Sequence, residues 1–137
     1  MNRVTLMHTG PLVAFLSARD HHHQWAAASF EALTGRGITC EAVLSEASFL
    51  EGRDGHRRAV VLELVQRMGM VVRPLGSELG ALRQLLEKYS SVPMSHADAC
   101  LVRLAELHAN AVVMICDANF RTYRRSNRRV VNTLMPG

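Results

Sequence analysis

The sequence predicts a three-layer α/β/α domain, with a central parallel sheet of about five strands covered by helices on both faces. Short apolar runs alternate with segments of helical periodicity along the whole chain. Strands that are joined by helices of this length pair in parallel and are buried on both faces. The chain has 137 residues, 48% of them hydrophobic, so we expect a single domain over residues 1–137 with a sizeable core.

The strands are predicted from short apolar runs that end at turn residues. The first run, 4–7, is followed by Gly10-Pro11, which turns the chain into a helix. The run at 111–116 is apolar throughout, as expected of a central strand. The expected strands are 4–7, 38–40, 70–75, 111–116 and 130–134, the last of them at a sheet edge.

Helices are predicted where apolar residues recur at three- and four-residue spacing, as the leucines of 77–89 do. Asp20 is expected to cap the second helix. Ser95 and Asp98 have the spacing of a capping box at the start of the last long helix. The expected helices are 12–18, 22–34, 41–50, 55–68, 77–89 and 95–108, and 118–123 is expected to form a short helix or turn.

The composition argues against a membrane or secreted protein. No apolar stretch approaches the roughly 20 residues of a membrane-spanning helix. The first apolar run reaches polar residues too early for a signal peptide. Cys40, Cys100 and Cys116 are odd in number and widely spaced, which favours small packing residues in a reducing compartment over a disulfide framework. We therefore expect a cytoplasmic protein with no membrane partner.

Three acidic residues lie within apolar segments that are far apart in the sequence: Glu46, Asp98 and Asp117. A buried carboxylate is costly unless it is paired or binds a metal. His8 ends the first apolar run, and Asp117 ends the run at 111–116. Ligands of parallel sheets bind outside the carboxyl ends of the strands, so these residues could converge on a divalent-metal site there.

The net charge of +4 is unevenly distributed, because five arginines crowd into residues 121–129 around Tyr123. Arginines beside an aromatic ring can hold a phosphate backbone and stack on a base. The same segment can equally be a solvated loop or a dock for an acidic protein partner. The five are Arg121, Arg124, Arg125, Arg128 and Arg129.

Several stretches in order resemble the PIN domain, the metal-dependent nuclease fold of VapC-type toxins, from Val4 to about Leu134. The matching stretches are VTLMHTGPLVAFL, DHHHQWA, CEAVLSEASFLEG, PMSHADACLVRLAELHANAVVMICDANF and RTYRR. The resemblance implies metal-assisted attack of water on an RNA phosphodiester. It also implies Mg²⁺ or Mn²⁺ as the cofactor, an antitoxin as a protein partner and a homodimer.

Carried over to this chain, the resemblance assigns a role to each of several residues. Glu46, Asp98 and Asp117 would be the catalytic acids and metal ligands, and His8 stands where the family has an aspartate. The supporting residues would be Thr9, Ser95 and Asn119, and close relatives often have acids at the last two positions. The RNA-binding residues would be Arg121, Tyr123, Arg124 and Arg125.

His8 is the departure with the largest consequence, because it removes a negative charge and offers a softer nitrogen ligand. Three interpretations follow: His8 is a ligand or neighbour of a working Mn²⁺ site; the site binds its metal weakly and turns over little or nothing; or His8 has no metal role. We therefore expect a ribonuclease-like PIN protein with a partly degraded acidic site, or alternatively a catalytically weak or inactive module that binds RNA or protein.

Overall fold

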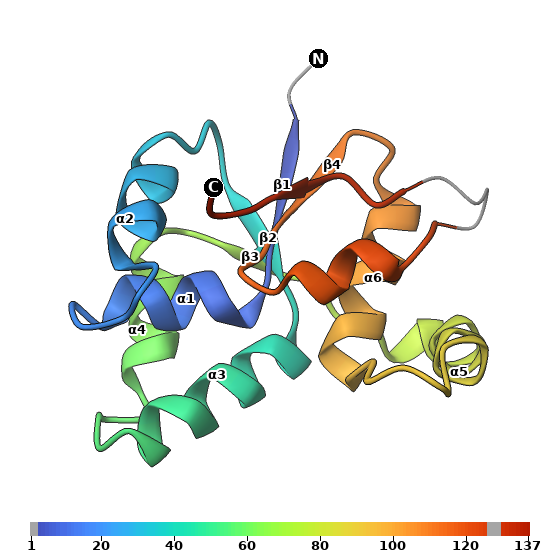
Figure 1. Ribbon diagram of the computed structural model, residues 1–137, viewed down its shortest axis with the longest axis horizontal. Coiled ribbons are helices and arrows are strands. Elements are labelled where there is room, and N and C mark those ends of the chain that lie inside the picture. The colour runs from blue at the N-terminus through green and yellow to red at the C-terminus, as the bar shows by residue number, and fades with distance from the viewer. Residues whose placement is uncertain (1–2, 126–129) are drawn as a thin grey trace.

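The computed structural model describes residues 3–125 and 130–137 (Figure 1). At its centre is a five-stranded sheet in the order β3-β2-β1-β4-β5, and every strand pair in it is parallel. The strands are β1 (Val4–Met7), β2 (Gly37–Thr39), β3 (Val71–Val72), β4 (Ala111–Met114) and β5 (Thr133–Leu134). β1 and β4 lie side by side at the middle of the sheet and pair along their whole length.

Six α-helices flank the sheet within the described chain, which confirms the expected α/β/α architecture. In the view of Figure 1, α1, α2 and α4 lie to one side of the strands, and α5 and α6 lie to the other. No helix among the described residues is long and apolar enough to cross a membrane. The helices are α1 (Thr9–Leu16), α2 (His23–Glu31), α3 (Glu41–Arg53), α4 (Val60–Arg67), α5 (Leu79–Lys88) and α6 (His96–Leu107), with 3₁₀ turns η1 (Gly76–Glu78) and η2 (Ala118–Thr122).

The element boundaries differ from the prediction where a side chain or a glycine ends the pattern. α1 begins at Thr9 instead of residue 12, because the His8 side chain accepts the Thr9 N–H and caps the helix. α3 continues to Arg53, and Gly55 then turns the chain with a φ of +85°. α4 therefore starts only at Val60, and the expected helix over 55–68 is too long.

Two other local predictions are corrected. α2 starts after His22, whose side chain makes no capping bond; the Asp20 carboxylate accepts the His22 N–H at 2.8 Å but lies before the cap position. The last strand is shorter than expected and spans Thr133–Leu134, although it does lie at a sheet edge.

The core forms where β1 and β4 meet α6. Leu6, Val113 and Met114 from the strands and Leu101 and Leu104 from the helix are fully buried and belong to one apolar cluster. Burial of side chains of this size contributes about 1.5–3 kcal/mol each. The adjoining ends of β1 and β4 are therefore held rigidly, and the functional site is built on them.

Candidate functional site at the carboxyl ends of the central strands

A cavity of about 340 Å³ opens beyond the carboxyl ends of β1 and β4. The chain builds the sheet outward from β1 to β3 and then returns to the opposite side of β1 with β4. This reversal is the place where open parallel sheets bind their ligands. The cavity brings together most of the residues singled out in the sequence: His8, Thr9, Glu46, Ser95, Asp98 and Asp117, together with Gly10, Leu50, Ile115 and Cys116.

His8 follows β1 and is held by three hydrogen bonds. Its backbone N–H donates to the Met114 carbonyl at 3.1 Å, which ties it to the end of β4. Its Nδ1 accepts the Thr9 N–H at 2.7 Å, and its Nε2 lies 2.6 Å from Oδ1 of Asp98. Because Nδ1 is an acceptor, these bonds assign the ring proton to Nε2, which donates it to Asp98.

This arrangement leaves neither ring nitrogen of His8 with a lone pair directed at the cavity. The ring is 6% exposed and its edge meets Phe120 at a centroid distance of 5.7 Å. A role as a metal ligand would require one of the two hydrogen bonds to break. A metal role of His8 stays a prediction, and the structure shows both ring nitrogens in hydrogen bonds to the protein.

Asp98 lies at the start of α6, where the predicted capping box with Ser95 is confirmed. The Ser95 hydroxyl accepts the Asp98 N–H, and the Asp98 carboxylate accepts the Ser95 N–H, both at 3.0 Å. The Tyr123 hydroxyl donates to the same carboxylate oxygen at 3.1 Å. Burial pushes the pKa of Asp98 upward, but the hydrogen bonds from His8, Ser95 and Tyr123 outweigh it and hold that pKa below its usual value.

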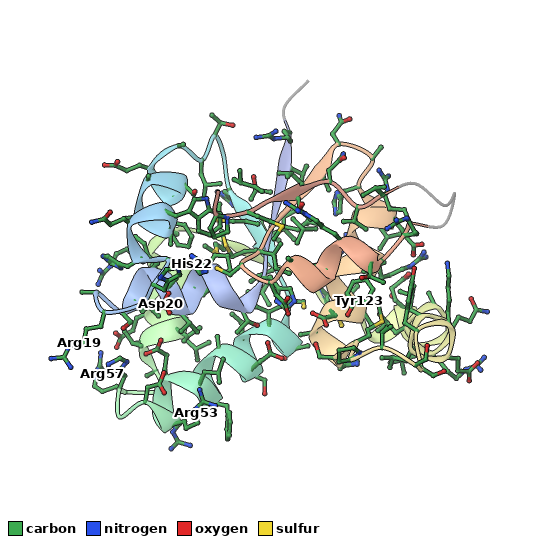
Figure 2. The ribbon with its side chains drawn as sticks, in the orientation of Figure 1. Arg19, Asp20, His22, Arg53, Arg57 and Tyr123 are labelled. Atoms are coloured by element: carbon green, nitrogen blue, oxygen red, sulfur yellow. The ribbon has the colours of Figure 1, made fainter. Side chains whose placement is uncertain are left out.

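Tyr123 follows η2 and lies beside α6 (Figure 2). It is 2% exposed, and its ring packs against the edges of Phe120 and Tyr89. Burial, followed by the nearby charge of Asp98, raises the pKa of its hydroxyl well above the usual range, so the hydroxyl stays protonated as a donor. The faces of this ring are not open to a nucleobase, which corrects the expectation that Tyr123 stacks on RNA.

The expected RNA-binding arginines have different surroundings. Arg121 is exposed. Arg124 folds back on its own backbone, donating to the Arg121 carbonyl at 2.6 Å and the Tyr123 carbonyl at 3.0 Å. Arg125 is half-buried. Contact of these three with RNA stays a prediction, and Arg128 and Arg129 lie outside the described residues.

Glu46 and Asp117 also line the cavity. Glu46 comes from the middle of α3 and is half-buried, with Leu50 one helical turn further along the same face. Asp117 follows β4 and is exposed. The Thr9 hydroxyl oxygen is buried and has no hydrogen-bond partner among the described residues. A buried hydroxyl without a partner indicates a place for a polar ligand.

Gly10 allows α1 to approach the end of β4. A Cβ at this position would lie 2.9 Å from Cβ of Cys116 and 3.1 Å from its sulfur. Gly10 and Pro11, predicted to form a turn before the helix, instead lie in the first turn of α1, and Gly10 provides close packing beside the cavity. Cys116 itself is half-buried, and burial, together with the charge of Asp20, raises the pKa of its thiol to about 11.

The donor chemistry of this cavity fits a hard divalent cation, because carboxylate oxygens are the ligands that Mg²⁺ and Mn²⁺ prefer. The detailed arrangement fits less well. Within the described part of the chain, no three His, Cys, Asp or Glu side chains are grouped to hold an ion. Asp98 also directs both carboxylate oxygens at protein donors.

Three further sequence features concern the adjacent histidines, Asn119 and the contact of Tyr123 with Asp98. Among the adjacent histidines of the α2 start, His23 bonds the Ala14 carbonyl through Nδ1 at 2.9 Å, and His22 lies on the surface between α1 and α2 (Figure 2). The expected supporting role of Asn119 falls on a side chain outside the described part. The contact of Tyr123 with Asp98 was not foreseen, since a separation of 25 residues leaves no local pattern.

The comparisons agree with this geometry. The family model for the PIN domain matches residues 8–126. Among solved structures, the chain is similar to VapC20 of Mycobacterium tuberculosis, a toxin described as cleaving the sarcin-ricin loop. The identity is 21%, and the TM-score is 0.77 over 86% of this chain and 93% of that one. No curated protein matches the sequence significantly. The chain belongs to the PIN domain family.

Proposed function

We propose that this protein is a VapC-like ribonuclease that hydrolyses phosphodiester bonds of RNA at the cavity beyond β1 and β4. The observation that carries the proposal is that Glu46, Asp98 and Asp117, from three separate segments of the chain, line one cavity at the switch point of a PIN fold. Carboxylate oxygens gathered from separate segments are the ligands that a hard divalent cation prefers.

Glu46, Asp98 and Asp117 would hold Mg²⁺ or Mn²⁺. Such an ion lowers the pKa of bound water and neutralises charge that builds up on the phosphate oxygens. Thr9, with its buried hydroxyl, would bind a polar ligand group beside the acids. Ser95 and Tyr123 fix the orientation of Asp98 through their hydrogen bonds to its carboxylate. Glu46 would orient the attacking water from its place on α3.

His8 is expected to weaken this site. It donates to Oδ1 of Asp98 over 2.6 Å, so a cation that takes this oxygen must displace the imidazole hydrogen bond. Replacement of a carboxylate by an imidazole also removes one negative charge from the cavity. We therefore expect weak divalent binding and slow turnover, with Mn²⁺ preferred over Mg²⁺ because it tolerates nitrogen near its coordination shell.

The same proposal includes the biological setting that the family suggests. The substrate would be a structured RNA, the regulator an antitoxin protein, the active form a homodimer and the compartment the cytoplasm. VapC20, which shares the fold, is described as cleaving the sarcin-ricin loop, so an RNA that contains this loop is a reasonable first substrate to test.

A second candidate is a PIN-like module that binds RNA or protein without turnover. The His8–Asp98 hydrogen bond favours it, because a fully bonded Asp98 contributes to folding whether or not a cation binds. Fold alone does not decide between the two, since one scaffold can host both an enzyme and an inactive relative.

Cleavage of RNA by purified protein separates the two candidates. The parent chain, Asp98→Asn and Glu46→Gln would be incubated with a sarcin-ricin loop RNA and an unrelated hairpin, each with Mn²⁺, Mg²⁺ or EDTA. Cation-dependent cleavage that both substitutions abolish supports the ribonuclease. Equal background in all three proteins, with unchanged circular dichroism spectra, removes it and leaves the binding module.

A further inference from the structure

Phe49 is an aromatic side chain on the surface of α3, 67% exposed to solvent. No other Phe, Tyr or Trp among the described residues is exposed. It borders a depression of about 740 Å³ between α3 and the segment that leads to α4. The other residues around this depression are Ser45, Ser48, Gly52, Arg53, His56, Arg57 and Arg58, which are polar, basic or glycine.

Three guanidinium groups border the same depression, and two of them are weakly engaged. Arg58 has no hydrogen-bond or ion-pair partner among the residues described. Arg53 approaches Asp54 only at 3.6 Å, with both side chains exposed, so this pair contributes little. Arg57 donates twice to Glu63, at 2.9 and 2.7 Å. Figure 2 shows Arg53 and Arg57 at the same end of α3.

Arg58 is positioned by a close approach to α3. A Cβ at Gly52 would lie 2.8 Å from Cγ of Arg58 and 3.0 Å from its Cδ, so the aliphatic part of this arginine rests on the glycine. Gly52 lies one helical turn beyond Phe49 on the helix surface. The arginine stem and the phenyl ring are therefore neighbours.

A hydrogen bond between the buried Glu51 carboxylate and the exposed His56 ring fixes the segment after α3. The Glu51 side chain is 1% exposed and lies 2.5 Å from Nδ1 of His56, whose backbone N–H also donates to the Glu51 carbonyl at 2.9 Å. A buried carboxylate held in this way stabilises one conformation of the loop, because breaking its contact would cost substantial free energy. The surface around Phe49 is thus preformed, which lowers the entropy cost of binding there.

This surface adjoins the acidic cavity through α3. Glu46 and Leu50 line the cavity, whereas Phe49 and Arg53 line the depression. Residues three or four positions apart are neighbours on a helix, so the Phe49 ring follows Glu46 within one turn, and Arg53 follows Phe49. A chain that leaves the cavity along α3 would meet the ring and then the guanidinium groups.

We propose that the depression formed by Phe49, Arg53, Arg57 and Arg58 binds single-stranded RNA. A base stacks on Phe49, and Arg53 and Arg58 contact phosphates, so the strand continues along α3 toward the cavity. Aromatic stacking beside backbone-tracking arginines is the combination that binds single strands without sequence preference. The inference rests on the proposed function in one respect, that RNA is the ligand of this protein. It does not require that the RNA be cleaved.

Fluorescence anisotropy of a short labelled single-stranded RNA, titrated with protein in EDTA, tests the proposal. Phe49→Ala should weaken binding about fivefold or more, and Phe49→Tyr should restore it, because one stacked base is lost and regained. Arg58→Ala should lower the slope of log affinity against log salt by about 0.7, the value for one phosphate contact on a single strand. Arg83→Ala, an exposed arginine on α5 paired with Glu87, is the matched control and should change neither quantity.

Three results would overturn the proposal. The first is that the parent chain does not bind the RNA. The second is that Phe49→Ala and Arg58→Ala bind the RNA with the same affinity as Arg83→Ala. The third is a parent dimer in sedimentation that Phe49→Ala converts to monomer while RNA affinity stays unchanged, which would assign this surface to a second copy of the chain. This proposal and that of catalysis can fail separately. If the parent binds the RNA tightly but, like Asp98→Asn, does not cleave it, the surface is supported and only the ribonuclease is contradicted.

Discussion

Asp98 and Glu46, two acids of the same cavity, differ in their surroundings. Asp98 accepts hydrogen bonds from His8, Ser95 and Tyr123, and the His8 ring is almost fully buried. Glu46 comes from the middle of α3 and is half-buried. Asp98 therefore contributes to folding stability through these bonds, whereas we expect Glu46 to contribute little.

The resemblance to PIN domains implies an aspartate where this chain has His8, and the observed bonding indicates what such an exchange would do to the scaffold. An aspartate beside Asp98 would repel it in the absence of a cation. Histidine instead donates a short hydrogen bond to Asp98 and also caps α1. We infer that the substitution exchanges part of the cation affinity of the site for internal bonding.

Removal of Asp98 should have the largest effect on folding. Asp98→Ala deletes the capping box and leaves His8 and Tyr123 without their acceptor, so we expect a loss of about 2–4 kcal/mol in the free energy of unfolding. Glu46→Ala, in the middle of α3, should cost under about 0.5 kcal/mol. Urea unfolding of both variants measures the difference, and equal losses would contradict the contrast between Asp98 and Glu46.

Gly10→Ala tests the packing of α1 against the segment that follows β4. The added methyl group would lie 2.9 Å from Cβ of Cys116, so we expect a loss of about 1–3 kcal/mol in unfolding free energy. Gly80→Ala is the control, because its Cβ meets nothing within 4 Å and it lies inside α5, where alanine should stabilise by about 0.5–1 kcal/mol. If thermal unfolding shows that both variants change stability in the same direction relative to the parent, this account is contradicted.

The low pKa of Asp98 predicts a smaller, pH-dependent effect. Because this pKa lies below its usual value of 3.8 in the folded protein, the unfolded chain binds the proton more readily in acid. The contribution of Asp98 to stability is thus complete well above pH 4 and is lost as the pH falls through its folded pKa. The stability advantage of the parent over Asp98→Asn should shrink between about pH 6 and about pH 3. An advantage that grows in acid would have the wrong sign.

The sequence predicted the fold class well because its signals are local and repeated. The apolar run Ala111–Met114 and the leucine spacing of Leu79–Lys88 indicate directly which side chains are buried. The boundaries were less predictable, since α1 begins at Thr9 through a cap made by a histidine side chain, an uncommon capping residue.

The members of the cavity were predictable for a similar reason, because carboxylates inside apolar segments are conspicuous. Their bonding was not. Tyr123 is 25 positions from Asp98 in the sequence and His8 is 90 positions from it, so neither contact leaves a periodic pattern. Tyr123 was consequently assigned to RNA stacking together with its arginine neighbours, although its ring is 2% exposed.

The most direct test of the central claim, that the His8–Asp98 bond competes with a cation for this cavity, is calorimetric titration of Mn²⁺ into the parent and into His8→Asp. We predict that the substitution strengthens Mn²⁺ binding on the order of tenfold or more, because it frees Oδ1 of Asp98 and adds a carboxylate ligand. Asp98→Asn in the His8→Asp background should remove the gain. Equal Mn²⁺ affinity of parent and His8→Asp would contradict the account.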